Sequence, residues 1–132
     1  MSRTRASARA AGSRFERVIA DYLAEHVDDR IDRRVKTGAK DRGDIAGLRH
    51  MGGRVVVECK DYAGSLVAAQ WVREAEIERG NDDAIAGIVV AKRMRNADPG
   101  AQYVLMTVRD LVALLTGERP PERGDSDPVV QG

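Results

Sequence analysis

The feature that most constrains this chain is an apolar run that ends in charge, Val55-Val56-Val57-Glu58-Cys59-Lys60. Three consecutive valines predict a buried β-strand. Side chains on a strand alternate between its two faces, so Glu58 and Lys60 share one face while Cys59 points to the other. Burying a carboxylate and an ammonium at the end of an apolar strand costs free energy unless the two groups act together or hold a metal ion. This strand end is therefore a candidate functional site.

Asp44 precedes this strand across a turn signal, His50-Met51-Gly52-Gly53. If the segments on either side form an antiparallel hairpin, the loop length decides which face Asp44 occupies. A three-residue loop, Met51 to Gly53, pairs Asp44 with Lys60 and places it diagonally beside Glu58. A two-residue loop sends Asp44 to the far face unless a bulge corrects the register. We expect the longer loop or a bulge, with a glycine at positive φ.

The charges of the chain are unevenly distributed. Charged residues make up 33 % of the 132 residues, yet the net charge is only +1. The first seventeen residues carry five arginines against the single acidic residue Glu16. We expect a disordered basic arm over residues 1–12, one compact domain over 13–116 and a flexible tail over 117–132. A basic arm on a near-neutral body suits contact with phosphates.

Several classes of protein are excluded by composition. One cysteine rules out an internal disulfide and a cysteine-based zinc site. No apolar run is long enough to span a membrane, and the N-terminus lacks the apolar core of a secretory signal. We therefore expect a cytoplasmic protein with no membrane partner.

Hydrophobic periodicity and turn residues predict three helices and five strands. The helices are expected over 13–26, 67–79 and 109–115, and the strands over 31–35, 44–48, 54–60, 84–91 and 103–108. The order α-βββ-α-ββ-α predicts an α/β domain with a mixed five-stranded sheet flanked by helices.

This order, with the residues above, resembles the PD-(D/E)XK nuclease superfamily, and within it the small Holliday junction resolvases of archaea and phages. The resemblance covers residues 13–115. In the superfamily the first helix carries a Glu, the second core strand an Asp and the third an acidic-x-Lys motif. The matching residues are Glu16, Asp44, Glu58 and Lys60, whereas Gly43 stands where the superfamily has Pro. The resemblance implies a restriction-endonuclease-like core in a protein encoded by a prokaryote or a phage.

The resemblance also implies a metal-dependent endodeoxyribonuclease that acts on branched DNA in recombination and repair. Mg²⁺ would be held by Asp44, Glu58 and the main-chain carbonyl of Cys59, with Mn²⁺ able to replace it, since hard oxygen ligands suit these ions. Glu16 would bind the ion through water or hold a second ion. Lys60 would orient the attacking water or help to deprotonate it. A nearby cation lowers the pKa of such a lysine and carboxylates raise it, and the sequence leaves the balance open.

The partners expected are DNA, above all four-way junctions, and a second copy of the chain. A resolvase cuts two symmetric strands, so its task requires a two-fold dimer. The residues expected to contact DNA are Arg14, Lys36, Lys40, Arg42, Gln70 and Lys92. For the three residues before Asp44 the alternative is a solvated loop, and for Gln70 an exposed helical side chain.

Two further functions remain open on these residues. The same fold and chemistry would serve a restriction- or repair-type endonuclease with another DNA substrate. A non-catalytic DNA-binding module on this fold is the other alternative. For the motif itself, the simplest interpretation is a Glu58–Lys60 pair on a solvated strand end with an unrelated Asp44.

Overall fold

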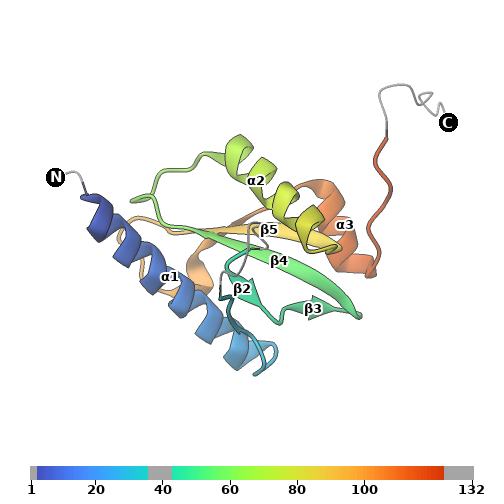
Figure 1. The fold of residues 1–132 in the computed structure, drawn as a ribbon, viewed down its shortest axis with the longest axis horizontal. Helices are drawn as coiled ribbons and strands as arrows, with labels where there is room; N and C mark the ends of the chain where they lie inside the picture. The colour runs from blue at the N-terminus through green and yellow to red at the C-terminus, as the bar shows by residue number, and fades with distance from the viewer. Residues whose placement is uncertain (1–2, 36–42, 124–132) are drawn as a thin grey trace.

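The structure is a computed structural model, and it describes residues 3–35 and 43–123. Within these ranges it is an α/β domain with one mixed sheet between helices (Figure 1). The strands are β1 (Asp32–Arg33), β2 (Ile45–Ala46), β3 (Arg49–His50), β4 (Gly53–Lys60), β5 (Ala86–Ala91) and β6 (Tyr103–Leu105). The helices are α1 (Arg5–His26), α2 (Ala68–Asn81) and α3 (Val108–Thr116), with the short 3-10 helix η1 (Pro99–Ala101) before β6. The predicted α/β class and mixed sheet are confirmed.

The sheet has the order β1-β2-β4-β5-β6, and β3 pairs with β4 outside this path. Only the central pair, β4 and β5, is parallel among the described strands. The strand expected over 44–48 is shorter in the structure, where only β2 lies within this range and β3 begins one residue after it. The strand expected over 84–91 forms the buried centre of the sheet, since Val89, Val90 and Ala91 are almost fully covered.

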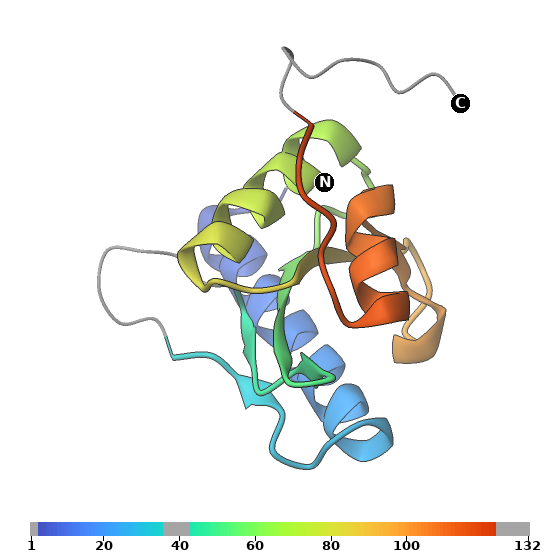
Figure 2. The same cartoon turned by 90° about the vertical axis from the view of Figure 1, so that its right-hand side faces the viewer.

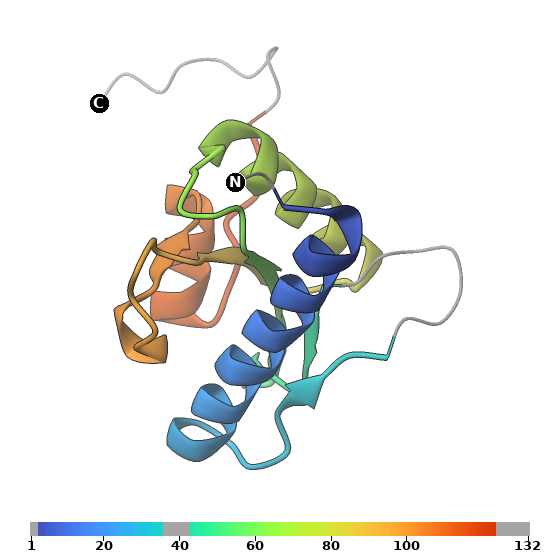
Figure 3. The same cartoon turned by 90° about the vertical axis from the view of Figure 1, so that its left-hand side faces the viewer.

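Helix α1 covers one face of the sheet, and helices α2 and α3 cover the other (Figures 2 and 3). On the first face, Phe15 and Ile19 of α1 pack against Val57 of β4. On the second face, Trp71 of α2 packs against Val89 of β5. The two apolar clusters fix α1 and α2 on opposite sides of β4, so groups at the end of this strand are reached by both helices.

Helix α1 begins at Arg5, whereas a disordered arm was expected over residues 1–12. The side chain of Thr4 accepts a hydrogen bond from the Ser7 N–H and caps the helix. The following segment is rich in alanine, the residue with the highest helix propensity. The arginine-rich composition suggested disorder, but the cap and the alanines extend the helix, and two arginines of the arm are thereby placed on it.

The hairpin between β3 and β4 has a two-residue loop, so the predicted three-residue loop is wrong and the bulge is correct. His50 pairs with Gly53 across Met51 and Gly52, and both loop residues have positive φ, as a type I′ turn requires. Further along, Ile45 pairs with Val57, which shifts the register by one residue relative to the hairpin. This shift returns Asp44 to the face of Glu58.

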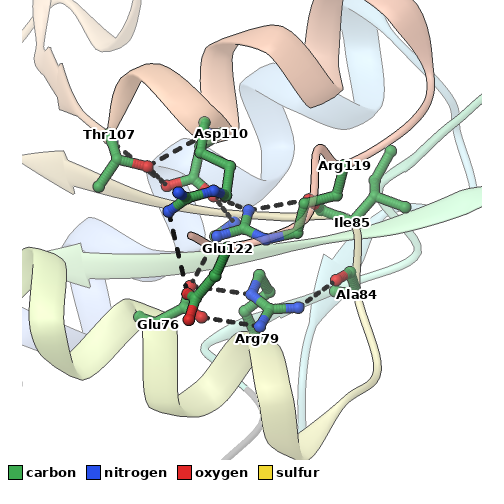
Figure 4. Close-up of polar contacts among 10 residues, drawn as sticks. Glu76, Arg79, Ala84, Ile85, Thr107, Asp110, Arg119 and Glu122 are labelled. Atoms are coloured by element: carbon green, nitrogen blue, oxygen red, sulfur yellow. Dashed lines mark hydrogen bonds and ion pairs between the residues drawn. The ribbon is translucent and has the colours of Figure 1, made fainter. Parts of the chain in front are cut away.

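Part of the expected C-terminal tail packs on the domain (Figure 4). The Arg119 guanidinium donates hydrogen bonds to Asp110 Oδ1 at 2.6 Å, to the Ile85 carbonyl at 3.1 Å and to Glu76 Oε2 at 3.1 Å. These contacts join the segment after α3 to both α2 and α3. Residues 124–132 of the expected tail lie outside the described residues. Among the described residues, no helix combines the length and apolarity needed to cross a membrane.

Candidate functional site

A cavity of about 570 Å³ opens at the carboxyl end of β4. The residues predicted to form the site, Glu16, Asp44, Glu58, Cys59 and Lys60, all line it. Glu16 comes from α1, Asp44 from the residue before β2, and the other three from β4. The fold therefore brings together side chains from three separate segments, as the sequence predicted.

Asp44 is held against the backbone of β4. Its side chain is buried, and Oδ2 accepts a hydrogen bond from the Cys59 N–H at 2.8 Å. Its own N–H donates to the Val57 carbonyl at 2.9 Å. The carboxylate is thus fixed by hydrogen bonds at the strand end where Glu58 and Lys60 stand.

The main-chain carbonyl of Cys59 points toward the same side as Asp44. In an extended strand the N–H and C=O of one residue lie on the same side of the strand. The Cys59 N–H points at Asp44, and the carbonyl of the next residue, Lys60, accepts from Lys92 on the opposite side. The carbonyl that the resemblance assigns to the metal is therefore on the side where the carboxylates lie.

Lys60 is a cation shared by two carboxylates. Its Nζ lies 2.7 Å from Glu74 Oε2 and 3.4 Å from Glu58 Oε1, with only 12 % of the side chain exposed. Burial lowers the pKa of Lys60, but the hydrogen bond that Lys60 donates to Glu74 and the charge of Glu58 outweigh it and raise the pKa above its ordinary value. In the metal-free protein, these carboxylates therefore keep Lys60 protonated at neutral pH.

Glu74 is a site residue that the sequence analysis missed. The hydrogen bonds from Lys60 and Gln70 lower the pKa of Glu74, so it is ionised. The sequence did contain a signal. Trp71 and Ala75 form the buried stripe of α2, and Glu74 lies beside this stripe on the first core helix after Lys60.

Glu16 is the third carboxylate near Cys59, after Asp44 and Glu58. Its carboxylate is partly buried and lies 3.4 Å from the guanidinium of Arg33. Burial raises the pKa of the Cys59 thiol, and the charges of Asp44, Glu16 and Glu58 raise it further. The thiol stays protonated, so Cys59 is not a thiolate nucleophile. That all three carboxylates act on one side chain agrees with their convergence on the cavity.

The backbone conformation at Gly43 explains why glycine, and not proline, stands before Asp44. Its φ is +92°, a conformation closed to proline, whose ring fixes φ near −65°. A Cβ at this position would lie 2.8 Å from Val56 Cγ1 and 3.1 Å from the Val57 carbonyl oxygen. Glycine lets the chain approach β4 closely enough for Asp44 to reach the Cys59 N–H.

The residues predicted to contact DNA have different surroundings. Lys36, Lys40 and Arg42 lie outside the described residues. Arg14 is exposed on α1, and Gln70 is exposed on α2 with its amide donating to Glu74 at 3.0 Å. Lys92 Nζ donates to the carbonyls of Arg93 and Asn96 at 2.8 and 2.6 Å, so this side chain holds the loop after β5 together.

Two arginines line the cavity although they were not singled out individually. Arg3 and Arg9 stand at the N-terminal end of α1, and Arg3 contacts both the side chain and the carbonyl of Asp61 at 3.1 Å. Because the sequence predicted a disordered arm, Arg3 and Arg9 were not expected at the site. A recognised helix cap at Thr4 would have placed them near Glu16.

The donor set suits Mg²⁺ in its chemistry. Over residues 3–35 and 43–123, no three His, Cys, Asp or Glu side chains stand together as a metal-binding group. Mg²⁺ is commonly bound by one or two carboxylates, with water and substrate phosphate completing the shell. Asp44 and Glu58 supply two carboxylates and Cys59 supplies a carbonyl, so the fit requires water and a phosphate as further ligands.

The arrangement as a whole is an acidic cavity with a fixed lysine and arginines at its edge. The chain matches no family model, and no characterised protein or solved structure is significantly similar to it.

Proposed function

We propose that this chain is a Mg²⁺-dependent endodeoxyribonuclease with a restriction-endonuclease-like core, and that it cleaves branched DNA in the manner of a Holliday junction resolvase. The observation that carries the proposal is the convergence of Asp44, Glu58 and Lys60, together with Glu16, on one cavity at the end of β4. Hydrolysis of a phosphodiester needs these functions side by side: oxygen ligands for a metal, and a cation for the phosphate.

The metal, when bound, would activate water and stabilise the charge that develops on the phosphate, and Mn²⁺ would replace Mg²⁺ in this role. Asp44 and Glu58 would hold the ion, and Glu16 would contact it through water. The carboxylates raise the pKa of Lys60, which favours an electrostatic role in which Lys60 orients water and offsets the charge of the phosphate. The ion pairs to Glu58 and Glu74 keep its ammonium in place for this role.

The substrate and assembly follow from the same proposal. Arg3 and Arg9 stand at the edge of the acidic cavity, where phosphates flanking the cleaved bond would pass. Arg14 and Lys92, farther from the carboxylates, would contact the same strand. Cleavage of two symmetric strands of a junction requires two such sites, and hence a two-fold dimer.

The test is a cleavage assay with the full chain and end-labelled DNA in Mg²⁺. Four-way junction, flap, mismatched and linear duplex substrates are compared at matched salt. We expect the junction to be cleaved fastest, and Asp44→Asn to lower the rate at least a hundredfold, as loss of one group that stabilises a transition state does.

Asp83→Asn is the matched control. It makes the same chemical change at an exposed residue with φ of +50°, a conformation that asparagine tolerates. No cleavage of any substrate by the folded protein contradicts the nuclease. Faster cleavage of linear or mismatched duplex supports a restriction- or repair-type enzyme instead. Full biological activity of Asp44→Asn supports a non-catalytic module.

A further inference from the structure

A second cavity, of about 320 Å³, lies beside the candidate site. Its apolar wall comes from α1, from the loop before η1 and from the first residue of η1, and consists of Ala11, Phe15, Val18, Ala97 and Pro99. Arg3, Arg14 and Lys92 add positive charge. Apolar surfaces combined with cations suit a ligand that has flat apolar faces and a negative charge.

The second cavity and the candidate site share Arg3 and Asp61 in their linings. These residues form an ion pair at 3.1 Å, which joins the start of α1 to the residue after Lys60. The ion pair therefore stands between the two cavities. A phosphate passing from one cavity to the other would meet the guanidinium of Arg3, whose two terminal nitrogens each donate one hydrogen bond to Asp61 and keep a second N–H for a phosphate oxygen.

We propose that this cavity binds the base of an unpaired nucleotide next to the scissile phosphodiester, an inference that rests on the nuclease function proposed above. A base inside a duplex is stacked on its neighbours and cannot enter a pocket, whereas an unpaired base can. The volume falls within the range of ligand pockets, which begins at about 300 Å³. A fully paired four-way junction offers such a base only where pairing at its crossover opens, so selectivity for branched DNA then arises from bases that are unpaired at the branch point.

The Gln102 amide and two donors of Lys92 are engaged within the protein, so these side chains do not read base edges. Gln102 Oε1 accepts from the Arg93 N–H at 2.6 Å, and its Nε2 donates to the carbonyls of Asn96 and Asp98. Lys92 uses two donors within its own loop. Contact with the faces of the base through apolar side chains tolerates all four bases.

A third cavity gives the DNA path a direction. It shares Arg9, Gly12 and Glu16 with the candidate site and is lined by the further arginines Arg17, Arg33 and Arg34. Asp32 and Val35 complete this lining, and the arginines form ion pairs with Asp32, Glu16 and Asp82 respectively. A lining dominated by charged groups suits the phosphates of a duplex and not its bases. The paired side of a branch would therefore lie over the arginines, and the unpaired side would enter the apolar cavity.

The test is a binding measurement with the full chain in Ca²⁺, which is chosen so that affinity is read without turnover. Fluorescence anisotropy compares forked DNAs that carry an abasic site at successive unpaired positions. We expect one position at which the abasic site weakens binding about tenfold, since one base contact of this kind is worth ~1–3 kcal/mol. At that position, 2-aminopurine should change its fluorescence on binding, and all four natural bases should bind equally.

Ala97→Trp should fill the cavity. The Ala97→Trp protein should bind the intact fork as weakly as the wild type binds the abasic fork. The control is Ala69→Trp, at an exposed position of α2 outside the cavity lining. This variant should still bind the intact fork about tenfold more tightly than the abasic fork. Equal affinity for intact and abasic forks, with no 2-aminopurine signal at any position, overturns the proposal. Base-dependent binding without any cleavage would contradict the nuclease function and keep the pocket. Cleavage of the junction without base-dependent binding would support the nuclease function and contradict the base pocket.

Discussion

Lys60 Nζ lies 2.7 Å from Glu74 Oε2, closer than the 3.4 Å that separates it from Glu58 Oε1. The lysine of β4 is therefore held chiefly by a carboxylate of α2. This helix is itself fixed to the sheet by Trp71, which is almost fully buried. The position of the ammonium thus depends on the packing of α2 and not on the strand alone.

Substitutions of Lys60 and of Glu74 distinguish the effect of the lysine charge from the effect of its positioning by Glu74. Lys60→Gln should lower the rate of junction cleavage at least a hundredfold, since it removes the cation that faces the phosphate. Glu74→Gln keeps an oxygen that Lys60 can reach and removes only one charge, so it should lower the rate less than tenfold. Single-turnover cleavage in saturating Mg²⁺ measures both effects.

Glu118→Gln, at an exposed residue after α3, is the matched control and should leave the rate unchanged. If Glu74→Gln is as damaging as Lys60→Gln, Glu74 takes part in the reaction directly and the positioning role assigned here is wrong.

Gly43 should be less tolerant of a side chain than another glycine with nearly the same φ. Gly52 has φ of +86° with nothing within 4 Å of an added Cβ, so Gly52→Ala should cost about 1–2 kcal/mol for the backbone conformation alone. Gly43→Ala adds a close contact with Val56, so its cost should be larger by at least 1 kcal/mol. Urea unfolding gives the two free energies, and equal costs would contradict the close approach of Gly43 to β4.

The Asp110–Arg119 pair should make stability depend on pH. Burial raises the pKa of Asp110, but hydrogen bonds from Arg119, Thr107 and the Gly87 N–H outweigh it and lower the pKa below its ordinary value of 3.8. A carboxyl whose pKa is lowered by folding stabilises the protein above its unfolded pKa, and this contribution is lost as the pH falls through the folded value. Unfolding free energy should therefore decrease as the pH drops below 3.8.

Asp110→Asn removes one partner of a pair that is almost fully buried, and should destabilise the protein by about 3 kcal/mol at pH 7. The difference from wild type should shrink below pH 3.8, where Asp110 itself becomes protonated. Asp83→Asn should show neither effect. A destabilisation by Asp110→Asn that is constant from pH 7 to acid pH would show that charge is not its cause.

A chain that ends after Thr116 tests whether the segment after α3 belongs to the domain. Such a chain loses Arg119 and leaves Asp110 and Glu76 without this cation. It should unfold at lower urea concentration than the full chain, by an amount similar to that of Asp110→Asn. A chain that ends after Arg123 should be as stable as the full chain. Equal stability of both truncated chains would mean that residues 117–123 form a tail without a structural role.

Local pattern predicted much of the fold. The spacing of Trp71 and Ala75 predicted α2, and the apolar run that ends at Ala91 predicted a buried central strand. Both features depend on periodicity within one segment, which the sequence displays directly. The start of α1 depended on a single capping residue, Thr4, and the basic composition around it was misleading.

The details of the site depended on contacts between distant segments. The register shift that returns Asp44 to the face of Glu58 lies in the chain between β2 and β3. The sequence predicted either a longer loop or a bulge for this purpose, and the turn residues alone do not distinguish the two. Glu74 and Arg119 were missed because their partners lie far along the chain. Sequence spacing identified which residue types belong to the site, and tertiary packing decided which of them touch.

The most direct measurement is a crystal of the full chain soaked in Mn²⁺ and analysed by anomalous diffraction. The account predicts one anomalous peak in the cavity at the end of β4, within about 2.0–2.3 Å of carboxylate oxygens of Asp44 and Glu58 and of the Cys59 carbonyl oxygen. The peak should vanish in Asp44→Asn. A peak only elsewhere in the crystal, or none in a crystal whose Asp44 and Glu58 are well ordered, would contradict the metal site on which the proposed nuclease depends.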